Sequence, residues 1–257
     1  MRNDDHSEPL QTLAAECLEC EFRESLLKAG GCRPGTICVQ AHAGQQIDRF
    51  FRAHPQHAAQ FIHNAYWERR AIAARYVPVQ LLPAMLNDPD EAVRRILAYR
   101  LPVEFLAGMR YDPDREVRIT IADRLPEDQL EMLAEDADYL VRVYVAKRLP
   151  AGRLFRLAAD ADNQVRRSVA ERIPAVSLGL MANDADVNIR RIIARRMDED
   201  DLAQLSADPD WTVRYEVALR AGPALLQNMT ADPEEDVRLL VHQRLTRPLV
   251  EASGHEF

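Results

Sequence analysis

Four cysteines near the start of the chain are the residues best suited to chemistry. Cys17, Cys20, Cys32 and Cys38 follow the pattern C-x2-C, eleven residues, C-x5-C, and no cysteine occurs after Cys38. Cysteine thiolates bind Zn²⁺ and iron–sulfur clusters, and two cysteines three positions apart can hold one side of such a centre. The spacing therefore predicts one metal centre held by these four side chains.

The spacing alone leaves the metal open, because a four-cysteine set suits a structural zinc ion as well as an iron–sulfur cluster. Disulfides are less favoured, since the polar N-terminus, Met1-Arg2-Asn3-Asp4-Asp5, lacks the apolar stretch of a secretion signal and disulfides persist in oxidising compartments. A segment of about 60 residues can bury only a small core. Metal ligation would therefore contribute to its folding.

Glycines between the cysteines would let the chain wrap closely around a metal centre. Gly30, Gly31 and Gly35 lie there beside Pro34, which would leave backbone amides free to donate to sulfur. Several histidines are nearby, but four cysteines already complete a ligand set. We therefore expect these histidines to be exposed or connecting residues: His6, His42, His54, His57 and His63.

Most of the remaining chain repeats with a period of 24 residues, which is typical of solenoid proteins. Each unit has an Asp, then a Val or Ile followed by Arg, and a second Arg six positions later. The Asp column is Asp88, Asp112, Asp136, Asp160, Asp184, Asp208 and Asp232; the first Arg column is Arg94, Arg118, Arg142, Arg166, Arg190, Arg214 and Arg238; the second is Arg100, Arg124, Arg148, Arg172, Arg196, Arg220 and Arg244. Seven units joined by six steps without an insertion indicate a stack of equivalent repeats.

Each unit begins with a helical pattern. Asp88 is expected to be the N-cap, because its carboxylate can accept hydrogen bonds from free amides of the first turn. Val93, Leu97 and Leu101 fall four residues apart, on one face of an α-helix. Pro102 should end the helix, because proline disfavours helical geometry in the residue before it.

The second half of the unit has only about ten residues, from Pro102 to Tyr111, to reach the next Asp. Its apolar residues Leu106 and Met109 lie three apart, which suits one or two turns of 3₁₀ helix. A unit of this size cannot bury its apolar face alone, so neighbouring units must stack. We expect Arg94 and its equivalents to pair with the Asp columns of the same or the adjacent unit, in preference to a basic face formed by the Arg columns for an anionic partner.

These columns resemble the leucine-rich repeat variant family. The resemblance covers residues 64–255 and is carried by D-x-D-x-x-V-R-x-x-V-A-x-R-L-P, as in residues 136–150, Asp-Ala-Asp-Tyr-Leu-Val-Arg-Val-Tyr-Val-Ala-Lys-Arg-Leu-Pro. It implies alternating α and 3₁₀ helices in a right-handed superhelix without strands. It also implies a [4Fe–4S] cluster on the four cysteines, with zinc as the alternative, and an association with nitrogen-fixing bacteria.

The sequence thus predicts an all-α solenoid behind a small four-cysteine metal domain. We place the iron–sulfur domain at residues 1–63 and about eight repeats at 64–257. The predicted function is an iron–sulfur protein whose repeats bind an unknown protein partner, in electron transfer or redox sensing. Two alternatives stay open: a purely structural metal site that caps a protein-binding solenoid, and a helical array that binds nucleic acid.

Composition narrows the function classes. The net charge of −8 argues against nucleic acid, because non-specific binding requires basic side chains that displace counterions. No apolar run approaches the roughly 20 residues needed to cross a membrane, so we expect no membrane partner and a cytoplasmic location. The sequence contains no phosphate-binding loop, dinucleotide fingerprint, zincin motif or nucleophile elbow, and we do not expect an enzyme.

Overall fold

The computed structural model describes residues 15–246, with side chains from Cys17 onward. The described chain divides into two compact units, one up to Arg124 and one from Leu125. Residues 1–14, at the start of the predicted metal domain, lie outside the described residues. Residues 247–257, at the end of the predicted solenoid, also lie outside them. The described part is helical apart from turns and one isolated bridge between Arg33 and Ile37, and none of its helices is long and apolar enough to cross a membrane.

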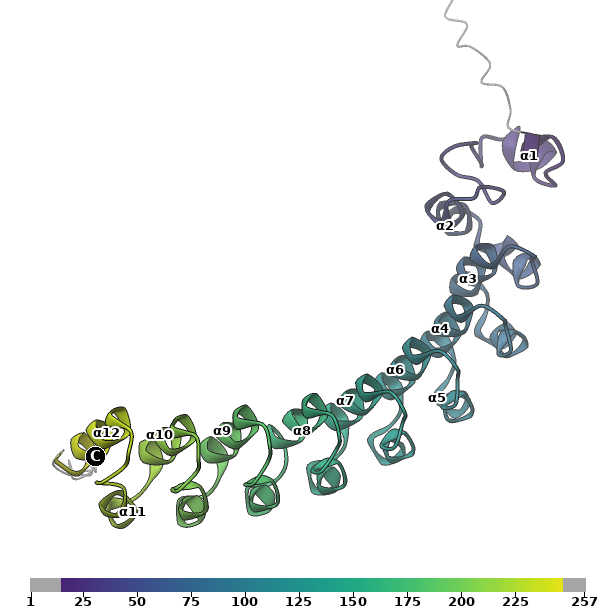
Figure 1. Ribbon diagram of the computed structural model, residues 1–257. Coiled ribbons are helices and arrows are strands. Elements are labelled where there is room, and N and C mark those ends of the chain that lie inside the picture. Colours follow the sequence, from purple (N-terminus) through teal and green to yellow (C-terminus); the bar gives the residue numbers. More distant parts are fainter. Residues whose placement is uncertain (1–14, 247–257) are drawn as a thin grey trace, which may run out of the picture. The chain divides into compact units, whose positions relative to one another are not determined.

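The first unit starts with short elements and continues as pairs of a long and a short helix (Figure 1). Its elements are α1 (Ala15–Leu18), the π-helical turn η1 (Arg23–Leu27), α2 (Gly44–Ala53), η2 (Pro55–Phe61), α3 (Trp67–Tyr76), η3 (Val79–Met85), α4 (Glu91–Arg100), α5 (Val103–Leu106), η4 (Ala107–Met109) and α6 (Arg115–Arg124).

The second unit consists entirely of such pairs, and its short helices lie together on one side of the row of long helices (Figure 1). Its elements are η5 (Glu127–Leu133), α7 (Tyr139–Arg148), η6 (Ala151–Leu157), α8 (Asn163–Ala170), η7 (Ala175–Met181), α9 (Val187–Arg196), η8 (Glu199–Leu205), α10 (Trp211–Arg220), α11 (Pro223–Asn228) and α12 (Glu235–Thr246).

The predicted pairing of a longer α-helix with a short second helix is confirmed. Most of the short helices are 3₁₀, as the spacing of Leu106 and Met109 suggested, while α5 and α11 are α-helical. The apolar columns form the core: Val93, Leu97 and Leu101 are fully buried. Leu101 is extended and precedes Pro102, as expected for the end of a helix before proline.

The N-cap prediction was wrong by two residues. Helix α4 starts at Glu91, and its N-cap is Asp90, whose carboxylate accepts from the amide of Ala92 at 3.0 Å. Asp88 lies two residues earlier and accepts from the amide of Asp90 at 2.9 Å. Aspartate is favoured at both positions, and Asp88 takes a different role because an arginine of the preceding repeat reaches it.

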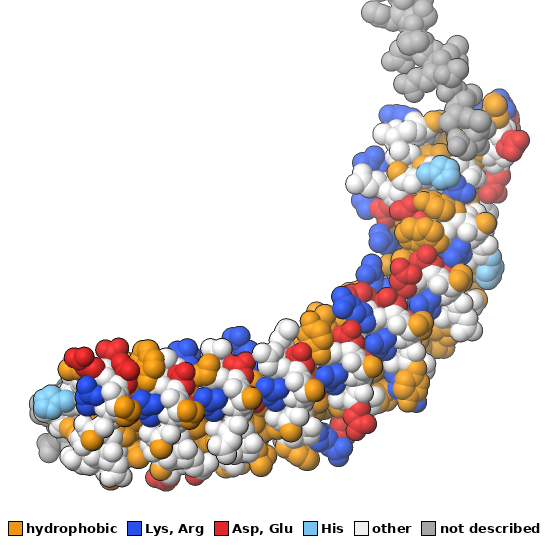
Figure 2. Space-filling model, in the orientation of Figure 1, with side chains coloured by type: hydrophobic (Ala, Val, Ile, Leu, Met, Phe, Trp, Pro, Cys, Tyr) orange, Lys and Arg blue, Asp and Glu red, His pale blue; other side chains and the backbone are white. Residues whose placement is uncertain are grey.

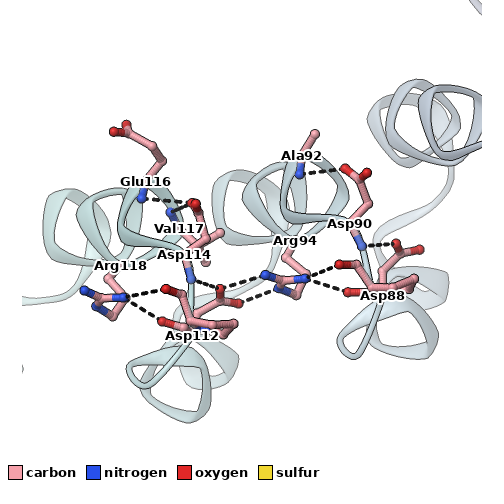
Figure 3. A network of polar contacts seen from close by, with 11 residues as sticks. Asp88, Asp90, Ala92, Arg94, Asp112, Asp114, Glu116, Val117 and Arg118 are labelled. Atoms are coloured by element: carbon pink, nitrogen blue, oxygen red, sulfur yellow. Dashed lines mark hydrogen bonds and ion pairs between the residues drawn. The ribbon is translucent and has the colours of Figure 1, made fainter.

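The first Arg column joins successive repeats within each unit, as Figure 3 shows for Arg94. Its Nε lies 2.7 Å from Oδ2 of Asp112 in the next repeat, and its Nη1 donates to the carbonyl of Asp88 at 2.8 Å. The same pairing recurs in Arg70–Asp88, Arg142–Asp160, Arg166–Asp184, Arg190–Asp208 and Arg214–Asp232. The prediction that this column forms inter-repeat ion pairs is confirmed, and Figure 2 shows basic and acidic side chains alternating along each unit.

The second Arg column binds backbone rather than carboxylates. Arg172 donates through Nη1 to the carbonyls of Ala146 and Leu149 at 2.6 and 3.0 Å, which belong to the end of the preceding long helix. Arg124, Arg196 and Arg244 make equivalent contacts one repeat back. Because the last carbonyls of a helix have no partner within it, a cation there is favourable. These arginines therefore cap the long helices that precede them.

One helix pair was not predicted. Helices α2 and η2 repeat the order of the long and short helix before residue 64, and the buried Ala58 and Phe61 lie 24 positions before Leu82 and Met85. Asn64 stands where later repeats have Asp, and it accepts from the amide of Tyr66 at 3.0 Å as Asp88 accepts from Asp90. The predicted boundary at residue 63 itself stays a prediction.

Candidate metal centre

All four cysteines line one cavity in the first unit. The space between its atoms is about 300 Å³, open solvent included, and the part that a water molecule could occupy is about 10 Å³. Its wall is largely apolar, with a single basic residue. The lining residues are Cys17, Cys20, Phe22, Arg23, Leu27, Cys32, Pro34, Cys38, Val39 and Phe50. The structure thus brings together every cysteine that the spacing selected.

A π-helical turn separates the first cysteine pair from the second. In η1 the amide of Leu27 donates to the carbonyl of Phe22 at 3.0 Å, and the amide of Gly31 then returns to the carbonyl of Leu26 at 2.7 Å. Wider turns of this kind are rare and occur often at functional sites. Here the turn brings Cys32 back towards the cavity that Cys20 lines.

The loop of the second cysteine pair depends on two glycines in the left-handed region. Gly30 has φ of 72° and Gly35 has φ of 82°, values that favour glycine because they bring a β-carbon against the backbone. Gly35 lies inside the turn closed by Arg33 and Ile37, where the amide of Arg33 donates to Ile37 at 2.7 Å. That turn places Cys32 and Cys38 at its two ends.

His54 supports this loop, and His57 packs against Phe22. His54 Nε2 lies 2.6 Å from the carbonyl of Gly31, and since a carbonyl only accepts, Nε2 carries the proton in this contact. A β-carbon on Gly31 would come within 3.2 Å of the same ring. The ring of His57 lies 4.7 Å from that of Phe22. We expected exposed or connecting residues at these positions, and the spacing of the histidines does not predict this role.

Phe22 fastens the cysteine loops to the first long helix. Its side chain is buried, and its ring lies 5.2 Å from the ring of Phe50 in α2. On the other side of the cavity the amide of Cys38 donates to the carbonyl of Gln46 at 3.2 Å, and Val39 is buried. The cavity is therefore anchored to α2 by both of its loops.

The thiols are close enough to interact electrostatically. Burial raises the pKa of the Cys32 thiol, and charge repulsion from Cys20, Cys38 and Cys17 raises it further. Cys20, Cys32 and Cys38 are not in disulfides. A cation bound in the cavity would remove this mutual repulsion, because metal coordination favours the thiolate form.

Four thiols around one partly apolar cavity suit a metal centre that is held by cysteine sulfur. Thiolates on one zinc, at about 2.3 Å from the metal, lie within about 4 Å of each other. In a cluster each cysteine binds its own iron, so the sulfurs stand farther apart around a shared space. The cavity presents the ligand set that either centre would use.

Two segments of the chain match known protein families. Residues 11–60, which include all four cysteines, are similar to the family described as LRV protein FeS4 cluster. Residues 139–162, which cover α7, η6 and the turn that follows, are similar to the family described as leucine rich repeat variant. The first match falls on the cavity and the second on one full repeat.

A solved structure extends the second similarity to nearly the whole chain. The protein described as a leucine-rich repeat variant with a novel repetitive protein structural motif is 52% identical, with a TM-score of 0.81, over 89% of this chain and 98% of that one. An uncharacterised 27.7 kDa protein in the nifB 3′ region of Rhodobacter capsulatus is 40% identical over 81 residues, which span 32% of this chain and about a third, 33%, of that protein. The predicted all-α repeat fold is confirmed.

Proposed function

Because the chain belongs to the leucine-rich repeat variant family, we propose that it is a redox-active protein without enzymatic activity whose repeats bind a protein partner. The family matches support an iron–sulfur-binding repeat protein. The proposal adds a cluster that exchanges electrons, in transfer or in sensing. The observation that carries it is the single cavity lined by all four cysteines.

Cys17, Cys20, Cys32 and Cys38 would hold a [4Fe–4S] cluster, with zinc as the alternative. Such a cluster, when bound, takes up and releases single electrons. The chain's own residues set its surroundings. Phe22 and Val39 are buried at the cavity and limit the access of water, while Arg23 brings a positive charge to its edge. Polarity, charge and exposure are the properties by which a protein tunes a cluster's reduction potential.

The long helices offer a surface for a protein partner. In the second unit a groove of about 550 Å³ lies over α9, α10 and α12. Trp211, Tyr215 and Leu239 line it together with the ion pair of Arg191 and Glu216. Trp211 is 41% exposed, and Trp67 occupies the same repeat position in the first unit with the same exposure. Exposed aromatic and arginine side chains are typical anchors of protein interfaces.

The net charge of the chain bears on nucleic acid as a partner, and its thiols bear on the cellular location. With a net charge of −8, we propose that the protein does not bind nucleic acid under physiological salt. We place it in the cytoplasm, where thiols stay reduced and available to metal. The Rhodobacter capsulatus relative is named for the nifB 3′ region, which supports a role near iron–sulfur chemistry in nitrogen-fixing cells.

The alternative is a metal site that only caps the repeats. The contacts between Cys38 and Gln46 and between Phe22 and Phe50 favour it, because they make the cysteine loops part of the packing around α2. Spectroelectrochemical titration of anaerobically purified protein separates the two roles. Redox activity requires that the cluster is reduced and reoxidised reversibly at a potential in the cytosolic range, with the helical circular dichroism unchanged. A cluster that cannot be reduced and reoxidised without unfolding of the protein supports the structural cap.

A pull-down from the native host tests whether the partner depends on the cluster. Intact protein is compared under anaerobic conditions with a Cys17→Ser/Cys20→Ser variant and with a Trp211→Ala/Leu239→Ala variant. The proposal expects one partner to be lost with both variants. A partner that binds all three proteins equally would contradict both the redox coupling and the groove.

A further inference from the structure

The short helices of the second unit carry an exposed apolar patch that the cluster and the groove do not use. Val176 is 86% exposed, Leu180 69% and Phe155 54%. Val176 and Leu180 both lie in η7, and Phe155 lies in η6. Gly179 lies against the side chain of Gln204 in η8, and the same relation one repeat earlier places Phe155 next to Leu180. Monomeric proteins seldom expose such side chains together without a binding role. We call Phe155, Val176 and Leu180 the η6–η7 patch.

Charges of opposite sign flank the η6–η7 patch. On one side, η6 carries Arg153 and Arg156. Helix η7, Ala-Val-Ser-Leu-Gly-Leu-Met, has no charged residue. On the other side, η8 begins with Glu199, Asp200 and Asp201, all exposed. The surface therefore changes from basic through apolar to acidic across three successive short helices.

These helices are neighbours within the unit. Arg153 and Arg156 of η6 pair with Glu131 of η5 at 3.4 and 3.0 Å. A β-carbon on Gly179 of η7 would lie 3.3 Å from the side chain of Gln204 in η8. The constant repeat step places η6 beside η7 in the same way. The guanidinium of Arg156 also lies 5.9 Å from the ring of Phe155, so the basic side adjoins the apolar centre.

We propose that a second copy of this chain binds the η6–η7 patch through a two-fold axis. Such an axis through η7 places η6 of one copy opposite η8 of the other. By symmetry, η8 of the first copy then lies opposite η6 of the second. Arg153 and Arg156 then face Asp200 and Asp201 of the second copy twice, with the apolar side chains between them. A basic–apolar–acidic surface is complementary to itself only in this arrangement.

The neighbouring helices agree with this pairing. The acidic residues of η5, Glu127, Asp128 and Glu131, lie beyond η6 and would meet α11 of the second copy. Helix α11, Pro-Ala-Leu-Leu-Gln-Asn, carries no charge, so no like charges are brought together. Glu131 pairs with Arg153 and Arg156, but the two arginine side chains remain 45% and 59% exposed. They are available to a second carboxylate.

Sedimentation velocity of the full-length protein tests the proposal over about 5–500 µM, where a small interface associates. The wild type should dimerise in that range. Leu180→Asp should raise the dissociation constant about tenfold or more, because it buries a charge against apolar side chains. The matched control Leu219→Asp, at an exposed position of the long helix α10, should leave the constant unchanged. Circular dichroism melts check that each variant is folded.

Charge reversal gives the sharper test. Arg153→Glu/Arg156→Glu alone and Asp200→Arg/Asp201→Arg alone should each weaken self-association about tenfold or more, because like charges then face each other. An equimolar mixture of the two variants should form a heterodimer, since every contact in it joins opposite charges. Any of three results would overturn the proposal. The wild type could stay monomeric at all concentrations, Leu180→Asp could leave the dimer as strong as before, or the mixture could form no heterodimer.

Discussion

Arg142 and Asp160, eighteen positions apart, form a two-pronged ion pair between neighbouring repeats, with Nε–Oδ2 at 2.7 Å and Nη2–Oδ1 at 2.8 Å. The same guanidinium donates through Nη1 to the carbonyl of Asp136 at 2.6 Å. One side chain therefore fixes the start of its own repeat and the start of the next. Both side chains are largely buried, with exposed fractions of 14% and 6%.

Removing one member of this pair should destabilise the second unit strongly. Asp160→Ala leaves the Arg142 guanidinium buried without its carboxylate, and we expect a loss of about 3 kcal/mol in the free energy of unfolding. Urea denaturation followed by circular dichroism measures it. The control Asp200→Ala, at an exposed position, should change stability by less than about 0.5 kcal/mol. Equal, small losses in both variants would contradict a structural role for the pair.

The aspartates of these pairs should make the fold sensitive to acid. Burial alone would raise the pKa of Asp160. Hydrogen bonds from Arg142 and from the Asp162 amide outweigh this effect, so the pKa of Asp160 is lowered. The pKa values of Asp88 and Asp232 are lowered in the same way. A carboxyl with a lowered folded pKa stabilises the fold above its unfolded pKa of about 3.9, and the stabilisation is lost as pH falls through the folded value.

Unfolding free energies should therefore be nearly constant from about pH 7 to 5 and fall below about pH 4. Asp160→Asn, which cannot titrate, should be less stable at neutral pH and show a shallower fall. A wild-type protein equally stable at pH 7 and pH 2 would refute the assignment.

The buried columns should respond to truncation as a packed core does. Leu97 and Val145 are fully buried in the long helices of the first and second unit. Leu97→Ala and Val145→Ala should each cost about 2–4 kcal/mol, from lost burial and the cavity left behind. Urea melts that show no loss of stability in either variant would contradict the stacking of the repeats.

The contact between His54 and Gly31 should matter for holding the cluster. His54→Ala removes the hydrogen bond to the Gly31 carbonyl but leaves all four cysteines in place. We expect the cluster absorbance to bleach in air at least a few times faster than in the wild type, by analogy with the loss of outer supports in metal sites. His63, which is exposed, gives the control His63→Ala. Identical bleaching rates for both variants would show that His54 has no such role.

The repeat was predictable because its signals are local. The 24-residue step, the buried Val93 and Leu97 columns and the proline after the helix each follow from sequence spacing. The N-cap was misplaced because Asp88 and Asp90 have the same local preference. Only Arg70 of the preceding repeat, which binds the carboxylate of Asp88, distinguishes the two aspartates. Because Arg70 lies 18 positions before Asp88, this contact is not local.

The metal centre was predictable only in part. Spacing selected the four cysteines, but the wall of the cavity comes from Phe22 and Phe50, which are 28 positions apart and show no periodicity. The helix pair α2–η2 was not predicted, because the polar columns of the repeat are missing before Asn64. The buried Ala58 and Phe61 keep the 24-residue step there. The role of His54 depends on a turn that no spacing rule describes.

Metal and sulfide analysis of the full-length protein, purified without oxygen, tests most directly that the four cysteines hold an iron–sulfur cluster. We expect a brown protein with broad absorption near about 400 nm, about four irons and four sulfides per chain, and loss of both in a Cys17→Ser/Cys20→Ser variant. A colourless protein that contains zinc, or iron that the cysteine variant retains, would contradict the account.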